Sequence, residues 1–244
     1  MLFLTMANAG YLELTENLIA NFQQSYMLRH DLIVECLDTE TNAILSVCNH
    51  SNINLMNSLS CSSHPQFYDY NSEGFRRIVS LKFPLLCLHL RRGQGHLWFT
   101  DSDIAYLRDP EPCVTKDWDV ITQTDEQSEE AYYGTNQCTG SMLVNSNSKS
   151  LAFFESIRDF HAQHPDLNDQ EAFGAFLVSK KIVDVRNLET CKFNILNPTL
   201  FPSGYKAFWS GVTLDPQTVA VHANFLIGKD AKRAALIRCG GWFL

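Results

Sequence analysis

The alternation of short apolar runs with segments of helical periodicity constrains this chain more than any other feature. Residues 2–5 and 31–38 have the composition of strands, and between them apolar residues from Leu14 to Phe22 recur at the spacing of one helix face. This pattern is typical of βα units around a mainly parallel sheet. We therefore expect an α/β fold with a Rossmann-like central mixed sheet flanked by helices.

The same alternation continues along the chain. Helices are expected at residues 75–90, 148–161 and 169–179, and Pro84 must start, kink or split the first of these. The polar, acidic stretch 124–137 predicts a mobile surface loop. Further strands are expected at residues 96–100, 118–122, 141–146, 181–185, 193–196 and 218–222.

The charge balance narrows the class of partner. The 244-residue chain has 19 Lys plus Arg against 27 Asp plus Glu, a formal net charge of -8. A nucleic acid polymer is not an expected partner, because its phosphates bind basic surfaces. No apolar run reaches the roughly 18 residues of a membrane span, and the first residues lack the basic flank of a signal peptide. We expect no membrane segment and a cytoplasmic location, or the Golgi lumen if this is the catalytic domain of a longer protein.

Cysteine usage gives a second indication of compartment. Eight cysteines are scattered without a CxxC pair, so a thiolate zinc site is not expected. Cys36 and Cys87 lie in apolar runs, where a free Cys packs as a small hydrophobic residue, as is typical of a reducing compartment. Against this, Asn49–Ser51 is a possible glycosylation sequon.

Two carboxylates, Asp101 and Asp103, follow the strand expected at 96–100. Like charges this close repel, and burial at a strand end raises the cost of keeping both ionised. A hard divalent cation with oxygen ligands removes that cost. The spacing therefore predicts a metal site at the end of this strand.

A strand ending in Asp-x-Asp is typical of two large enzyme classes. Phosphatases of the haloacid dehalogenase type usually carry it on the first strand, whereas GT-A-type glycosyltransferases carry it on an internal strand, where it holds a divalent ion against a diphosphate. Here the strand is internal, and residues 104–110 lack the small or hydroxylic residues that usually follow the phosphatase motif. Position and context favour the glycosyltransferases.

The segment WFTDSDIAYLRDP closely resembles the nucleotide-diphospho-sugar transferase family, which includes plant cell-wall xylosyl-, arabinosyl- and galactosyltransferases. The likeness covers nearly the whole chain, and several motifs in the right order are far more specific than one. It implies a single GT-A-type catalytic domain over 1–244, with a nucleotide-binding half (1–103) and a sugar, acceptor and metal half (104–244). The other matching segments, in order, are TMANAGYLELTENL, CTGSMLVNSN, NDQEAF and VHANFLIGKDAKRAALIRCGGW.

The resemblance implies Mn²⁺ or Mg²⁺ at the predicted metal site. Asp101 and Asp103 are the expected ligands, with Asp103 the direct one. His222 matches the place where related enzymes such as glycogenin complete the metal site with a His. From the residues alone, Asp101 could instead cap a turn and His222 could be structural.

The nucleotide is expected over the carboxyl ends of the first strands, where open α/β sheets bind ligands. Gly228 would allow close backbone approach, and Lys229 and Lys232 would meet the phosphates as point charges, with Lys232 fitting the family spacing better. Lys82 resembles a family position that faces the nucleotide. The full set of expected donor-binding residues is Thr5, Ala7, Asn8, Asp38, Lys82, Ser102, Gly228, Lys229 and Lys232.

The transferred sugar is expected to contact Thr139, Gly140 and Ser141. Asp169 and Gln170 are the expected catalytic residues, because they resemble the Asp-Gln pair of plant and glycogenin-like relatives that retain the anomeric configuration. The resemblance thus implies retention, whereas the residues alone leave open inversion, which needs a general base. Asp169 could also be a helix N-cap.

Together these features predict a metal-dependent transferase that moves a sugar from a nucleoside-diphosphate sugar, with a UDP-sugar favoured, to a glycan or glycoprotein acceptor. A dehalogenase-type phosphatase and a non-catalytic carbohydrate-binding protein on a degenerate transferase fold are the alternatives. The degenerate fold would predict broken metal and phosphate motifs, whereas the expected residues are all present. The acceptor depends on loop shape rather than on motifs.

Overall fold

The computed structural model describes residues 1–47, 50–59, 66–211 and 213–244, so the sequon residue Asn49 lies outside the described residues. The chain divides into two compact units. Unit 1 consists of Met1–Tyr70, Thr100–Cys113 and Thr199–Leu244, and unit 2 of Asn71–Phe99 and Val114–Pro198.

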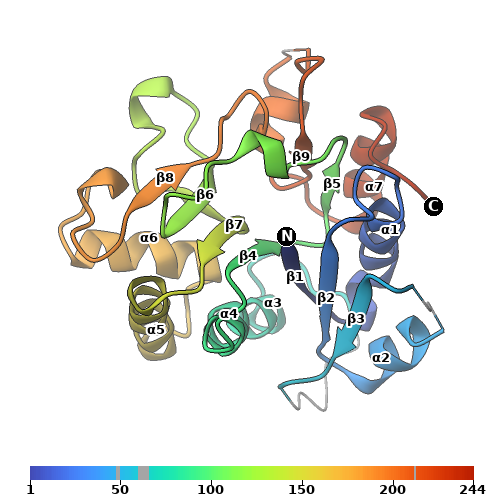
Figure 1. Ribbon diagram of the computed structural model, residues 1–244, viewed down its shortest axis with the longest axis horizontal. Helices are drawn as coiled ribbons and strands as arrows, with labels where there is room; N and C mark the ends of the chain where they lie inside the picture. Colours follow the sequence, from blue (N-terminus) through green and yellow to red (C-terminus); the bar gives the residue numbers. More distant parts are fainter. Residues whose placement is uncertain (48–49, 60–65, 212) are drawn as a thin grey trace. The chain divides into compact units, whose positions relative to one another are not determined.

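The strands form a seven-stranded sheet and a separate two-stranded sheet (Figure 1). In the larger sheet, unit 1 contributes strands in the order β3-β2-β1, which pair in parallel, and unit 2 contributes them in the order β4-β7-β6-β8. β6 pairs antiparallel with β7 and parallel with β8. The predicted α/β class with a mainly parallel mixed sheet flanked by helices is confirmed.

Unit 1 begins with a βα unit. An apolar run forms β1 (Leu2–Ala7), α1 (Leu12–Phe22) follows, and β2 (Asp31–Cys36) lies in parallel register beside β1. Asp38 then caps α2 (Thr39–Leu45), which leads to β3 (Ile53–Met56).

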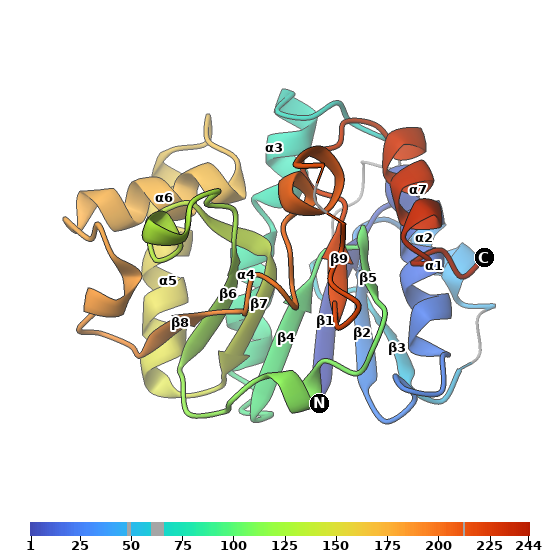
Figure 2. The ribbon, with the colours of Figure 1, turned by 90° about the horizontal axis from the view of Figure 1, so that it is seen from above.

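The rest of unit 1 is built from segments distant in sequence. The short strands β5 (Ile104–Tyr106) and β9 (Ala220–His222) form the two-stranded sheet, and α7 (Lys229–Arg238) lies beside α1 in both ribbon views (Figure 2). A buried apolar cluster joins these elements, so the C-terminal segment packs on the N-terminal one. Its members are Leu14, Ala105, Val221, Ala223 and Leu236.

Unit 2 contains α3 (Glu73–Val79), α4 (Lys82–Leu90) and β4 (His96–Thr100), of which only Thr100 falls in unit 1. The single helix expected at 75–90 is therefore split, and Pro84 lies in the first turn of α4, where its missing N–H is tolerated.

The remaining elements of unit 2 are β6 (Val120–Thr124), β7 (Gln137–Asn145), α5 (Ser148–Gln163), α6 (Asp169–Ser179) and β8 (Phe193–Ile195). Capping boxes at Asn147 and Asn168 start the two helices. Edge-to-face phenylalanine contacts form the core between them, including Phe153 with Phe173, whose ring centroids lie 5.9 Å apart.

One predicted strand is wrong. Residues 181–185 are not a strand, because α6 ends there with Lys181 in the left-handed conformation (φ 59°). The N–H of Ile182 donates to the carbonyl of Leu177 at 3.0 Å and that of Lys181 to Val178 at 2.8 Å, which is the Schellman pattern. The apolar residues that suggested a strand thus belong to a helix end, and β3 and β5 were missed.

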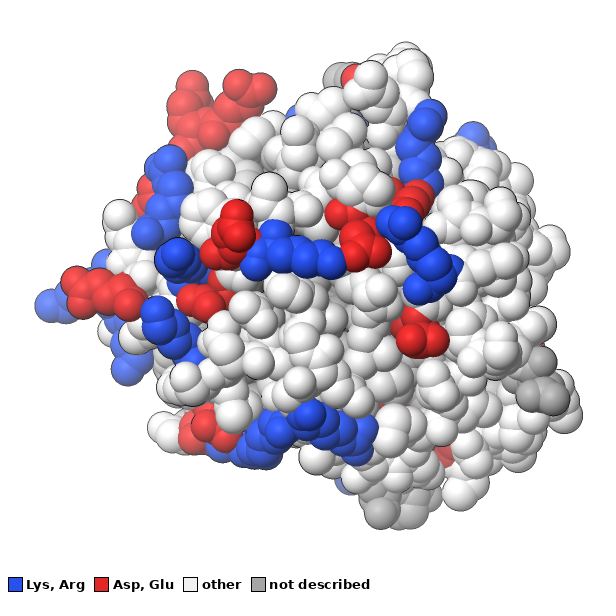
Figure 3. Space-filling view, viewed as in Figure 1, with Lys and Arg blue, Asp and Glu red and all other residues white. Residues whose placement is uncertain are grey.

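Two surface properties bear on the predicted partners. Acidic and basic side chains are interspersed on the face that Figure 3 shows. Within the described part of the chain, the helices are too short or too polar to span a bilayer.

Candidate active site

The register of the two-stranded sheet assembles the predicted metal ligands in unit 1. β5 and β9 pair antiparallel with Ile104 opposite His222, and the N–H of Ala223 donates to the carbonyl of Asp103 at 3.0 Å. This pairing brings the end of β9 beside the Asp-x-Asp segment, although the two are far apart in sequence.

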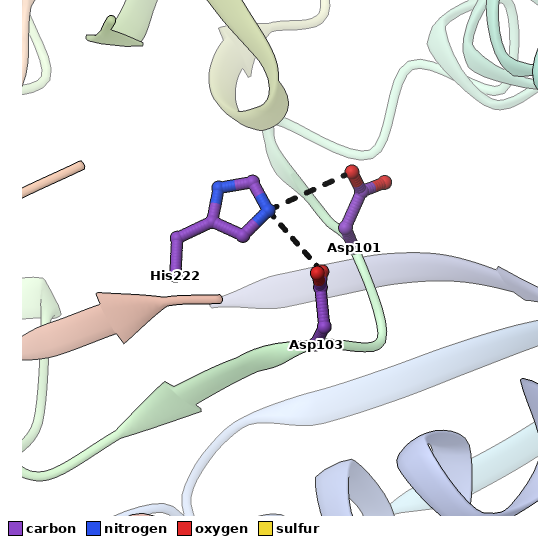
Figure 4. A group of neighbouring side chains, drawn as sticks. All are labelled: Asp101, Asp103 and His222. Carbon is purple, nitrogen blue, oxygen red and sulfur yellow. Dashed lines mark ion pairs between the residues drawn. The ribbon is translucent and has the colours of Figure 1, made fainter. Parts of the chain in front are cut away.

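The three side chains point toward one another (Figure 4). His222 Nε2 lies 3.2 Å from Asp103 Oδ1 and 3.9 Å from Asp101 Oδ2. One potential ligand atom from each residue lies within 4.8 Å of the others. Asp103 and His222 are buried, whereas Asp101 is half-buried. Two carboxylate oxygens and one imidazole nitrogen fit a divalent ion, so the three predicted ligands form a candidate metal site.

Lys232 joins this cluster from α7. Its ammonium forms an ion pair with Oδ2 of Asp103. Burial by itself would raise the pKa of Asp103, but Lys232 and then His222 outweigh it and hold that pKa below its ordinary range. Gly228 precedes α7 with φ 86°, a conformation that favours glycine, while Lys229 is exposed. The site therefore keeps an ionised carboxylate and an ammonium side by side.

Tyr11 is a neighbour of the site that the sequence analysis missed. It packs against the apolar cluster that contains Ala105 and Val221. Burial raises the pKa of its phenol, and the negative charges of Asp103, Asp101 and Asp69 raise that pKa further. Its hydroxyl donates to the carbonyl of Tyr68 at 3.2 Å, and its ring centroid lies 4.9 Å from that of Phe67. The segment TMANAGYLELTENL contains it, so the family resemblance was the signal that could have found it.

The predicted nucleotide residues of β1 and β2 make local contacts. Asp38 caps α2 by accepting from the Thr41 N–H at 2.7 Å, and it accepts from the Ala9 N–H at 3.0 Å. The Asn8 amide donates to the carbonyl of Gln66 at 3.0 Å. Thr5, Ala7 and Asn8 are buried and Ser102 is half-buried. Nucleotide binding by these residues stays a prediction.

Unit 2 holds a second polar cluster. Lys82, which is 2% exposed, forms an ion pair with Asp169, and the Thr139 hydroxyl donates to Asp169 Oδ2 at 2.6 Å. The Lys82 Nζ also lies 5.0 Å from the centroid of the Phe99 ring. Burial alone would raise the pKa of Asp169, but Lys82 and Thr139 lower it below its ordinary value. The structure thus brings Lys82 to a predicted catalytic residue.

The first turn of α6 orients the predicted catalytic pair. Asn168 is the N-cap, so the N-cap alternative for Asp169 is wrong, and Asp169 is the first residue of the helix. The carboxamide of Gln170 contacts Asp125 and Asn136, two residues that sequence analysis did not single out. Within β7, Gly140 is buried and Ser141 accepts a hydrogen bond from the Trp98 indole at 3.1 Å.

The α/β fold and the candidate metal site are those expected of a nucleotide-sugar transferase. Residues 28–236 match the nucleotide-diphospho-sugar transferase family, so the chain belongs to this family. The predicted family is confirmed, and the phosphatase alternative is excluded.

Similar proteins agree with this assignment. The chain is 26% identical to UDP-galactose:fucoside alpha-3-galactosyltransferase of Dictyostelium discoideum over 98% of its own length, but it spans only 42% of that relative. The galactosyltransferase LgtC, solved with donor and acceptor sugar analogs, has a TM-score of 0.51 at 14% identity, covering 91% of this chain and 86% of that one. The apo-form glycosyltransferase GlyE of Streptococcus pneumoniae has a TM-score of 0.56 at 12% identity, with 91% and 53% covered. These structures share the fold, which is the GT-A type predicted.

Proposed function

We propose that this chain catalyses metal-dependent transfer of a sugar from a nucleoside-diphosphate sugar to a glycan or glycoprotein acceptor, as one catalytic domain. The observation that carries the proposal is the convergence of Asp101, Asp103 and His222 within 4.8 Å in a member of this family. Two carboxylates and an imidazole beside the Lys232 ammonium form a charged cluster, two of whose members, Asp103 and His222, are buried, and a bound divalent ion and diphosphate would account for it.

In unit 1 the proposed roles follow from charge. Asp101, Asp103 and His222 would hold Mn²⁺ or Mg²⁺, which when bound neutralises the growing charge of the departing diphosphate. Lys232 supplies a fixed positive charge for phosphate oxygens from α7, and Gly228 leaves room for them at the helix start. Tyr11, in the same unit, offers a flat face for the nucleobase, and Asp38 keeps its predicted role at the base or ribose.

In unit 2 the proposed roles concern the sugar. Thr139 and Asp169 offer hydroxyl and carboxylate groups for sugar hydroxyls. Inversion would need a general base, but Lys82 holds Asp169 as an anion with a lowered pKa, which makes it a weak proton acceptor. Gln170 beside it cannot titrate at all. These properties favour retention, in which an oxygen of the departing phosphate takes the acceptor proton.

The donor and acceptor are proposed more broadly. The name of the Dictyostelium relative contains UDP-galactose and a fucoside, so a UDP-sugar is the preferred donor and a glycan the preferred acceptor class. The cytoplasm or the Golgi lumen stays the predicted compartment.

The test is a release assay for UDP with UDP-galactose, UDP-glucose and UDP-xylose, each with Mn²⁺ and with excess chelator. We expect metal-dependent release from one of these donors, and an anomeric proton of unchanged configuration when the product is followed by NMR. Asp103→Asn should abolish the release while thermal unfolding shows an intact fold.

Asp230→Asn is the matched control, because it removes the same charge from an exposed position of α7. Its rate should stay near that of the wild type. A folded wild-type chain without donor turnover under any condition would favour the non-catalytic alternative. An inverted product would overturn the proposed retention.

A further inference from the structure

Both side-chain N–H groups of Gln170 donate hydrogen bonds within the protein. Its Nε2 donates to Asp125 Oδ2 and to Asn136 Oδ1, each at 3.0 Å. A carboxamide has only two N–H donors, so these two acceptors use both of them. The NH₂ group must therefore face Asp125, and the carbonyl oxygen Oε1 must face away. Within the part of the chain that the structure describes, Oε1 accepts no hydrogen bond.

Hydrogen bonds hold the backbones of the two acceptor residues, Asp125 and Asn136. The N–H of Asp125 donates to the carbonyl of Asn136 at 3.0 Å, which continues the pairing of β6 with β7 beyond its last register pair. Asp125 is 3% exposed, and Glu126 Oε1 accepts from the Asn136 N–H at 3.2 Å. These hydrogen bonds join the two ends of the predicted surface loop, residues 124–137.

Glycine is required within this loop. A Cβ on Gly134 would lie 2.6 Å from Glu126 Oε1 and 2.9 Å from the carbonyl oxygen of Ala131. The neighbouring Gln137 amide donates to the carbonyls of Tyr132 and Gly134 at 3.0 and 2.8 Å. These contacts keep Asn136 in place beside Asp125.

Gln170 and its two acceptors, Asp125 and Asn136, are called the clamp below. The backbone of Gln170, the donor, is also constrained. Gln170 is the second residue of α6, whose first turn is fixed by the capping box between Asn168 and Glu171. The preceding residue, Asp169, is anchored by its ion pair with Lys82. A side chain whose backbone and amide nitrogen are both fixed has lost the two-fold freedom that a terminal carboxamide normally has.

We propose that Asp125 and Asn136 are positioning residues that fix the Gln170 carboxamide with Oε1 presented to the transferred sugar. This inference rests on the proposed function of the chain. A carbonyl oxygen carries partial negative charge, and a glycosyl centre gains positive charge as the leaving group departs. A preorganised dipole stabilises that charge without reorganising during the reaction, whereas a flipped amide would present N–H groups of the wrong sign.

The test is a double-variant cycle on donor turnover. Asn136→Ala removes one acceptor at an exposed side chain, so folding is not at risk, and Asp125→Ala removes the other. We expect each to lower kcat about 10-fold to 100-fold, the range for a misplaced group, with KM for the donor nearly unchanged. In the Gln170→Ala background neither should have a further effect, because the group they position is gone. Asp125→Asn retains an acceptor oxygen and should restore most of the rate.

The matched control is Glu130→Gln, which removes a charge from an exposed position of the same loop and should leave kcat unchanged. Equal reductions in the wild-type and Gln170→Ala backgrounds would overturn the positioning role, since the residues would then act independently of Gln170. An unchanged kcat in Asn136→Ala would overturn it as well.

A readout without turnover separates this inference from the proposed function. The Gln170 side-chain NH₂ signal, assigned by its absence in Gln170→Glu, should exchange slowly with solvent and exchange faster in Asn136→Ala. Fast exchange in an active wild type would overturn the clamp alone. A wild type with the protected signal but no donor turnover would overturn the proposed function, and with it the catalytic purpose of the clamp.

Discussion

Asp169→Asn should destabilise the chain by about 3–5 kcal/mol, the usual cost of removing one partner of a buried ion pair. The Lys82 side chain is 2% exposed and the Asp169 side chain 8%, so the remaining ammonium would have no water to replace its counter-ion. Asn keeps the volume of Asp and can still accept from the Thr139 hydroxyl. The change therefore isolates the lost charge.

Thermal unfolding by circular dichroism measures this effect. At about 2–4 °C per kcal/mol for a chain of this length, the Tm should fall by roughly 6–20 °C. Asp184→Asn is the matched control in the same unit, because it removes a charge paired with Arg186, whose side chain is 59% exposed. An exposed pair contributes at most about 1 kcal/mol, so that Tm should move by no more than about 4 °C.

Two further results decide the interpretation. Lys82→Met added to Asp169→Asn removes the ammonium that lost its Asp169 counter-ion and should restore most of the lost Tm. The pKa of Asp169 is lowered in the folded chain, so its contribution should be complete above about pH 4 and fade as the pH falls through the folded-state pKa. A Tm change in Asp169→Asn no larger than in Asp184→Asn, or a double variant as unstable as the single one, would refute the reasoning.

Three other predictions concern the stability of the fold and the reactivity of its cysteines. Burial lowers the pKa of His30 despite its hydrogen bond to Asp109, so the imidazole takes up a proton at higher pH in the unfolded chain than in the folded one. The free energy of unfolding should therefore fall as the pH drops below about 6.5. His30→Gln should remove up to about 2 kcal/mol of the loss at pH 5, which Tm values measured at pH 7 and pH 5 would show. Burial raises the pKa of Cys87 to about 11 and that of Cys191 to about 12. Iodoacetamide at pH 8 should therefore modify the exposed Cys113 well before these two thiols. Mass spectrometry measures the labelling, and equal rates at the three cysteines would contradict the prediction. A Cβ on Gly10 would lie 2.2 Å from the backbone of Gln66 and Phe67, so Gly10→Ala should cost about 1–3 kcal/mol in urea unfolding, and an unchanged midpoint would show that this segment can move aside.

The comparison of sequence with structure shows where local patterns suffice. Apolar patterning located β4, a continuous apolar run, and α6 at their observed bounds. It missed β5, because an element of three residues is too short to show a pattern. It also read residues 181–185 as a strand, since composition cannot distinguish a strand from a Schellman turn with apolar flanks.

The candidate site was predictable only in part. Asp101 and Asp103 follow from strand-end chemistry, whereas His222 required the family resemblance, because its place beside Asp103 depends on the register of β5 with β9. The ion pair of Lys82 with Asp169 and the acceptors of Gln170 joined residues distant in sequence, and no local pattern reports such contacts. The positions of these side chains depend on tertiary contacts, which residue type alone does not report.

The most direct test of the central claim is a Mn²⁺ titration followed by electron paramagnetic resonance, on the wild type, His222→Ala, Asp103→Asn and the control Asp230→Asn. If Asp101, Asp103 and His222 hold the ion, the wild type and the control should bind Mn²⁺ with the same affinity, and UDP should strengthen that binding. His222→Ala and Asp103→Asn should each weaken it by at least about tenfold while their Tm values show folded protein. Four identical titration curves would contradict the account, because the ion would then bind elsewhere or not at all.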